Sequence, residues 1–277
     1  MNLIVGTPPS MAICVLDNFI SRFIKLLVSC KWYSQLYLKL VTLCREKLCR
    51  FKVQDMEFVK LERQHADEVV SLMADMFMKH EPTFSCLKVP VGTATHYCKL
   101  VVNRAINDNV SLVAITTKEN KIVGAIANFL DDGEPIEGDI NDTALLRPMT
   151  PISSIVDLLK ARFYDLEEVK ELQQSGNVFM ELHMVAVRDG YHGQGIARRL
   201  IQESLLMGMA KGAKMAYGEA TNPITQHITQ GTLGFVQVGE MIEYTTFEYD
   251  DKRPFSDMPA AYMGAILVVK SLNYSRL

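Results

Sequence analysis

The stretch VAVRDGYHGQGIARRL, residues 185–200, passes from an apolar segment through a glycine-rich turn into a helical pattern. Such a junction leaves several backbone N–H groups without partners at the positive end of a helix, and phosphate binds readily there. Gly193 and Gly195 would let a phosphate approach the main chain, because neither carries a side chain. The segment therefore predicts an anion site, although glycine turns of this kind also serve purely structural roles.

The same stretch excludes two common nucleotide-binding motifs. No Gly-Lys-Ser/Thr follows the turn, so it is not the P-loop of a nucleoside triphosphatase. The third glycine of the dinucleotide-binding fingerprint is also missing.

The strand at 185–187 and the turn beginning at His192 resemble the acetyl-CoA pyrophosphate loop of the GNAT superfamily of N-acetyltransferases. Its usual pattern is Arg/Gln-x-x-Gly-x-Gly/Ala, and this chain departs from it with Gly190 at the charged position. The resemblance implies an α/β GNAT fold with a mixed central sheet flanked by helices, and acetyl-CoA as co-substrate. The residues it assigns to cofactor binding are Val185, Ala186, Val187, His192, Gly193, Gln194, Gly195, Ile196 and Ala197.

The sequence that follows extends the resemblance to about residues 57–270. Residues 213–220 read as a strand, and Asn222-Pro223 is a helix start, with Asn222 at the cap and proline in the first turn. The helix would end at Leu233-Gly234-Phe235, which is similar to the family's "LGF" ending. Asn222 is further expected to contact the pantetheine arm of the cofactor or the substrate.

Composition favours a folded enzyme with one main domain. The chain has 277 residues, of which 48% are hydrophobic and 22% charged, and its net charge is −3. A chain of this size and composition can form a substantial core, and its charge gives no electrostatic footprint for nucleic acid. We expect a basic, apolar, helical extension over 1–55 and a GNAT domain over 56–277.

The extension allows two interpretations. It carries eight lysines and arginines against three acidic residues, which leaves the remainder strongly acidic. Charges interrupt its apolar residues too often for a membrane span, and no signal peptide is indicated. Residues 17–50 could touch a membrane surface weakly as an amphipathic helix, but an appended arm without that role is favoured.

The cysteines and histidines show no metal-ligand spacing, so no metal is expected. Four of the six cysteines lie in the extension, which suits reduced thiols in a cytoplasmic protein better than a disulfide framework. The oligomeric state is left open.

Periodicity places the other elements. Strands are expected at 57–62, 110–117, 122–130 and 178–187, and helices at 64–79, 92–106 and 153–173. Residues 131–150 are rich in Asp, Gly and Pro and read as a loop. The helical insertion at about 131–176 is unusual for a minimal GNAT fold and resembles the arylalkylamine N-acetyltransferase branch of invertebrates.

Three residues are candidates for catalysis. His80-Glu81-Pro82 is similar to that branch's "(Asp/His)-Glu-Pro" motif, and the resemblance makes Glu81 the general base. Glu181 and His183 are the rivals. By period-two alternation they are expected to share a face of their strand with Val185 and Val187.

A base is wanted because an alkylamine is protonated at neutral pH, whereas attack on a thioester needs the neutral amine. Backbone N–H groups near 184–186 could stabilise the tetrahedral oxyanion. The branch's two serines appear as Asn222 and Gln226, and the tyrosine acid of many GNAT enzymes appears as Gln230.

The sequence thus predicts acetyl transfer from acetyl-CoA to the primary amine of a small molecule, of the arylalkylamine class by resemblance. A protein or polyamine N-acetyltransferase is the first alternative. A non-catalytic acyl-CoA-binding module is the second, and the missing proton donors keep it open.

Overall fold

The computed structural model describes residues 55–131 and 144–272, which belong to one compact unit, Asp55–Leu277. The predicted extension over 1–55 and its membrane contact through 17–50 lie outside the described residues, apart from Asp55. Most of the expected loop at 131–150 lies outside them too.

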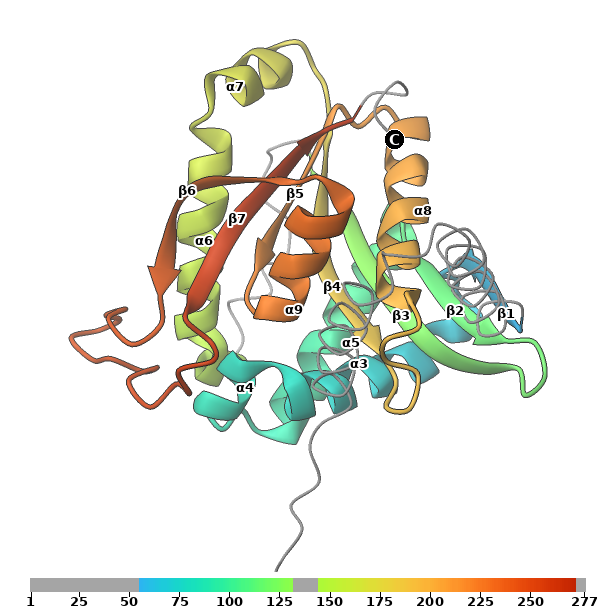
Figure 1. Ribbon diagram of the computed structural model, residues 1–277, viewed down its shortest axis with the longest axis horizontal. Helices are drawn as coiled ribbons and strands as arrows, with labels where there is room; N and C mark the ends of the chain where they lie inside the picture. The colour runs from blue at the N-terminus through green and yellow to red at the C-terminus, as the bar shows by residue number, and fades with distance from the viewer. Residues whose placement is uncertain (1–54, 132–143, 273–277) are drawn as a thin grey trace, which may run out of the picture. The chain divides into compact units, whose positions relative to one another are not determined.

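Seven strands form one sheet (Figure 1). The strands are β1 (Met56–Lys60), β2 (Leu112–Thr116), β3 (Lys121–Asp131), β4 (Phe179–Val187), β5 (Met215–Ala220), β6 (Val236–Glu243) and β7 (Gly264–Ser271). Their order is β1-β2-β3-β4-β5-β7-β6. All neighbours are antiparallel except β4 and β5, so the sheet is mixed, as the GNAT resemblance implies.

Helices cover both faces of this sheet. The α-helices are α3 (Ala66–His80), α4 (Pro82–Cys86), α5 (Val91–Asp108), α6 (Thr150–Tyr164), α7 (Glu167–Gln174), α8 (Ile196–Ala210) and α9 (Pro223–Gln226). Short 3-10 helices occupy Arg63–His65 (η1) and Arg147–Met149 (η3), and a π-helix, η4, occupies His227–Thr232. None of the helices within 55–131 and 144–272 combines the length and apolarity that crossing a membrane requires.

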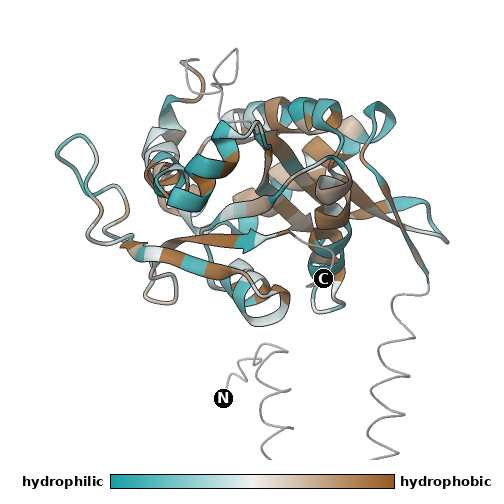
Figure 2. Cartoon of the chain, turned by 90° about the horizontal axis from the view of Figure 1, so that it is seen from above, coloured by the Kyte–Doolittle hydropathy of each residue, from teal (hydrophilic) through white to brown (hydrophobic). Residues whose placement is uncertain are grey.

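The apolar residues divide by face. Helix α8, with η4, packs on one face of the sheet, and the cluster there includes Leu200, Ala216 and Ile266. On the other face α3 and α5 cover the β1–β4 half, and α6 covers the β5–β7 half. Figure 2 shows the hydrophobic residues following the strands and the sides of the helices turned toward them. This burial is the main force that holds the layers together.

One helical prediction needs correction. The single helix expected over 153–173 is two helices, because Leu166 takes an extended conformation (φ −67°, ψ 131°) and starts α7. That break turns Leu166 and Val169 toward the core, where both pack. The Glu81-Pro82 pair ends α3 as expected, but Pro82 is also the first residue of the short α4, a position that proline favours.

A β-bulge changes the direction of side chains in β4. In the register with β3, Ala127 pairs with Met184 and Asn128 with Leu182, so His183 has no partner. An extra residue reverses the alternation beyond it. Val185 and Val187 consequently pack on the α8 side, whereas Ala186 packs on the α3 side. The expectation that they share a face with Glu181 and His183 was therefore wrong.

Helix α6 of the insertion is part of the core. Phe163 is fully buried, stacks on Tyr217 with ring centroids 4.1 Å apart and meets Phe179 edge to face at 5.2 Å. We expect Phe163→Ala to lower the free energy of unfolding by about 3–5 kcal/mol, because it removes a large buried ring and leaves a cavity.

Leu158→Ala is the matched control, since Leu158 lies on the same helix and is 50% exposed. Its effect should stay within about 0.5 kcal/mol in urea denaturation. Equal losses in the two variants would contradict the placement of α6.

Candidate active site

The centre of the sheet opens between β4 and β5. Their parallel ladder has three pairs among the described residues, Phe179–Met215, Met180–Ala216 and Glu181–Tyr217. Beyond Glu181 the backbone of β4 has no pairing with β5, while its pairing with β3 continues to Val187. Main-chain groups on one side of β4, around 184–186, are therefore free of the sheet ladder and available to a bound molecule.

Glu81 lies at the end of β5, although it comes from the α3–α4 junction. Its carboxylate accepts hydrogen bonds from Thr83 Oγ1 (3.0 Å), Thr221 Oγ1 (3.0 Å) and Asn222 Nδ2 (3.2 Å). The residue is 6% exposed, and no cation pairs with it in the described part of the chain. Burial raises the pKa of Glu81, and the three hydrogen bonds oppose that rise only in part.

Glu181 and His183 form a hydrogen-bonded pair. His183 Nδ1 lies 2.6 Å from Glu181 Oε1, and His183 Nε2 lies 2.7 Å from Tyr97 Oη of α5. A carboxylate can only accept, so Nδ1 carries the proton of a neutral His183 and Nε2 accepts from the tyrosine. The sequence brings Glu181 and His183 together correctly, but Tyr97 was not anticipated.

Glu181 is also held by a lysine from the insertion. Lys160 Nζ of α6 lies 3.1 Å from Glu181 and 2.6 Å from Asp131, and Tyr217 Oη donates to both carboxylates. Burial alone would raise the pKa of Glu181, but the hydrogen bond from His183 and the charge of Lys160 outweigh it and lower that pKa. A carboxylate held ionised in this way is a weak base.

Glu219 is a functional candidate that the sequence reasoning missed. It lies on β5 between Tyr217 and Thr221, and period-two alternation puts all three on one face. Its Oε1 is sealed from solvent and has no hydrogen-bond partner among the described residues. Burial, and secondly the charge of Glu181, raise the pKa of Glu219 well above its ordinary value. The sequence does contain a sign of this site, because Glu219 is the one charged residue in the segment MAYGEA of β5.

The glycine turn has the backbone that the sequence suggests. Gly193 (φ 72°) and Gly195 (φ 79°) lie in the left-handed region, and a Cβ built on either would meet nothing within 4 Å. No side chain caps the start of α8, so its first N–H groups stay available. His192 Nε2 donates to Val187 O (2.7 Å) and Gln194 Nε2 to Gly190 O (3.3 Å), which braces the turn internally.

The start of α8 is packed closely on the sheet. Ile196 is buried, and a Cβ on Gly124 of β3 would come within 2.7 Å of its Cγ2. Ile196 and Ala197 can therefore contribute backbone N–H groups to an anion, while the side chain of Ile196 fixes the helix against β3.

The residues after β5 have mainly structural contacts. Asn222 Oδ1 accepts from Thr225 N at 2.9 Å and so caps α9 as predicted. Gln226 Nε2 donates to Ala220 O (3.1 Å) and Gly264 O (2.9 Å), and Gln230 is exposed. Tyr244 Oη, which the sequence reasoning missed, donates to Thr221 O at 2.6 Å, beside Glu81.

Comparison with solved structures identifies the fold. No family model matches the sequence. The C-terminal condensation domain of Ebony, in complex with beta-alanyl-dopamine, is 19% identical with a TM-score of 0.65, covering 78% of this chain and 99% of that one. Arylalkylamine N-acetyltransferase 2 from Aedes aegypti is 19% identical with a TM-score of 0.63, covering 79% and 100%.

A polyamine N-acetyltransferase of Drosophila melanogaster, which catalyses the formation of N-acetylagmatine, is 12% identical with a TM-score of 0.54, covering 79% and 100%. The chain therefore has the GNAT fold and resembles the invertebrate arylalkylamine branch in structure.

Proposed function

We propose that this protein transfers the acetyl group of acetyl-CoA to the primary amine of a small molecule. The observation that carries the proposal is Glu81, a buried carboxylate without a cationic partner in the described residues, held at the end of β5 where β4 and β5 part. The glycine turn and the uncapped start of α8 supply the second requirement, a site for the diphosphate of the cofactor. The solved structures of similar fold support the same reaction class.

Glu81 is the better base of the two glutamates. A general base works best when its pKa lies near the working pH. Burial moves the pKa of Glu81 upward, whereas His183 and Lys160 hold that of Glu181 down. Glu181 instead orients His183 and, through it, Tyr97. We assign Glu81 as base and Glu181 and His183 as a supporting pair.

The reaction begins with a proton transfer and ends with release of coenzyme A. Glu81, directly or through water, takes a proton from the ammonium group, and the neutral nitrogen attacks the thioester carbonyl. Main-chain N–H groups near 184–186 stabilise the oxyanion. The C–N bond forms, the C–S bond breaks, and the thiolate recovers a proton, from solvent or from the attacking nitrogen. Asn222, which donates a hydrogen bond to Glu81, would contact the pantetheine arm of the cofactor or the substrate.

Glu219 supports a cationic substrate. Its unpaired Oε1 lies on the face of β5 between the Glu181 network and Glu81, and an ammonium group would supply the missing partner. Opposite charge favours the ionised carboxylate, so an amine bound there would lower the pKa that burial raises. We favour arylalkylamines as substrates because the fold is similar to that of an arylalkylamine N-acetyltransferase. Polyamines are the second candidate, because the carboxylate of Glu219 could pair with any alkylammonium group.

The direct test mixes the purified protein with acetyl-CoA and a panel of arylalkylamines, agmatine and polyamines, and measures the thiol released. Turnover with a small amine is expected. Binding of coenzyme A without turnover would favour a non-catalytic acyl-CoA-binding module instead, and turnover with peptides alone would favour protein acetylation.

Glu81→Gln tests the base. We expect kcat to fall by about 10²–10⁴-fold with little change in unfolding, because glutamine keeps the shape but cannot take a proton. In the unchanged protein kcat/KM should rise as pH increases through the pKa of Glu81, above the range of an ordinary glutamate, and this limb should vanish in the variant. A larger loss in Glu181→Gln than in Glu81→Gln would reverse the assignment.

Gly195→Ala tests the diphosphate site. Alanine at this positive φ costs about 1–2 kcal/mol of strain and places a methyl group where the diphosphate would approach. Calorimetry should show coenzyme A binding weakened by about tenfold or more. Gly212→Ala is the control, since Gly212 (φ 95°) lies beyond the other end of α8 in equally open space. The Gly212→Ala variant should lose a similar amount of stability but bind coenzyme A as tightly as the unchanged protein. Equal weakening of coenzyme A binding in both variants would count against the diphosphate site.

Glu219→Gln tests amine recognition. A hydrogen bond to a charged group contributes about 1.5–3 kcal/mol, so the KM of the amine should rise by roughly ten- to a hundredfold. The KM of acetyl-CoA should not change, which separates substrate recognition from a general disturbance. An unchanged amine KM would show that the substrate binds elsewhere.

A further inference from the structure

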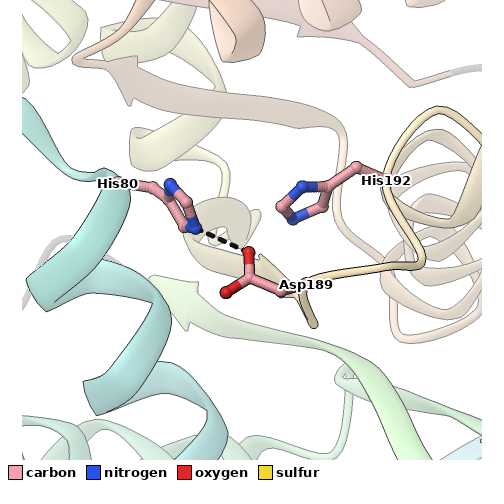
Figure 3. A group of neighbouring side chains, drawn as sticks. All are labelled: His80, Asp189 and His192. Carbon is pink, nitrogen blue, oxygen red and sulfur yellow. Dashed lines mark hydrogen bonds and ion pairs between the residues drawn. The ribbon is translucent and has the colours of Figure 1, made fainter. Parts of the chain in front are cut away.

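His80, Asp189 and His192 converge on the surface beside the glycine turn (Figure 3). His80 ends α3, whereas Asp189 and His192 belong to the turn between β4 and α8. One ligand atom from each residue lies within 4.8 Å of the other two, and all three residues are exposed. No metal-ligand spacing is visible in the sequence, because His80 is 109 residues from Asp189.

The chemistry of the three groups suits a divalent transition metal. Two imidazoles and one carboxylate are a common donor set for zinc, with water completing a tetrahedron. The His80 and His192 rings lie edge to face, with centroids 5.5 Å apart. Figure 3 shows His80 and Asp189 directed toward each other, with the ring of His192 turned toward both.

A hydrogen bond from His192 to the main chain leaves the Nδ1 lone pair of His192 free. Its Nε2 lies 2.7 Å from the carbonyl oxygen of Val187, which can only accept a hydrogen bond. The neutral ring therefore carries its proton on Nε2, and Nδ1 keeps the lone pair that a metal requires. Metal-binding histidines usually donate their other ring N–H to a carbonyl or a carboxylate in this way.

The two oxygens of Asp189 have separate roles. Oδ1 lies 2.8 Å from His80 Nε2, whereas Oδ2 lies 3.5 Å from Lys79 Nζ, which also bonds Asp75 at 2.8 Å. Ligand atoms about 2 Å from a tetrahedral zinc are roughly 3.3 Å apart, so His80 and Asp189 need to separate by about 0.5 Å. The proton that His80 Nε2 now donates to Asp189 must also move to Nδ1, so that Nε2 can bind the metal through its lone pair. As an exposed ion pair they would contribute little by themselves.

We propose that His80, Asp189 and His192 form a site for a divalent transition metal ion of the zinc class, which clamps the β4–α8 turn to the end of α3. The metal bridges two segments that are linked here by exposed contacts of Asp189 with Lys79 and His80. A bound ion would restrict the turn. That this turn also holds the cofactor's diphosphate rests on the proposed function, but the metal site does not.

The experiment titrates the full, reduced protein with Zn²⁺ by calorimetry, without coenzyme A, so that its outcome is independent of acetyl transfer. We expect the double variant H80A/H192A to bind one equivalent fewer than the unchanged protein. Zinc taken up by cysteines would appear equally in both. His227→Ala, which removes an exposed histidine of η4, is the control and should retain the full stoichiometry.

Hydrogen exchange tests the clamp. Zn²⁺ should slow exchange of the amides of residues 189–195 in the unchanged protein and in His227→Ala, but not in His80→Ala, which lacks the ligand from α3. Equal zinc stoichiometry in the unchanged protein and the double variant would overturn the site. Equal protection in His80→Ala would overturn the bridge between the two segments.

Discussion

The short ladder between β4 and β5 is the constraint on which the candidate site depends. Only three residue pairs join these strands in the described chain, after which each continues with its antiparallel neighbour alone. Unpaired main-chain groups are costly to bury and are normally satisfied by another partner. A molecule lying in the opening can provide that partner, and Glu81 and Glu219 are at its margin.

The bulge at His183 supports the same opening. Without it, period-two alternation would direct Val185 and Val187 to the face that carries Glu181. His183 stays beside Glu181 and Tyr97, and the extra residue returns the two valines that follow to the core under α8. The bulge at His183 thus lets β4 carry Glu181 and His183 on one face of the sheet and Val185 and Val187 on the other. The second face packs under α8, next to the glycine turn.

Much of this architecture was predictable from sequence because the relevant signals are local. The strand, turn and helix at 179–210, the cap at Asn222 and the end of α3 at Glu81 all follow from periodicity and capping chemistry. The fold class was implied by the resemblance of these segments, taken in their order along the chain, to the GNAT superfamily.

The unpredicted features depend on contacts between distant segments. The bulge, the place of β7 between β5 and β6, and the network of Lys160, Asp131 and Tyr217 have no local signature. The break at Leu166 turns Leu166 and Val169 toward the core, and helical periodicity alone does not reveal that packing. Glu219 was visible as an acid in an apolar strand, but its lack of a partner was not.

Helix α6 has one further consequence, for protein engineering. The same helix places Phe163 in the core and Lys160 against two sequestered acids. A chimaera that exchanged this insertion for a shorter connection would lose hydrophobic contact and charge neutralisation together. Such a graft would have to bring its own cation, or replace Asp131 and Glu181 as well.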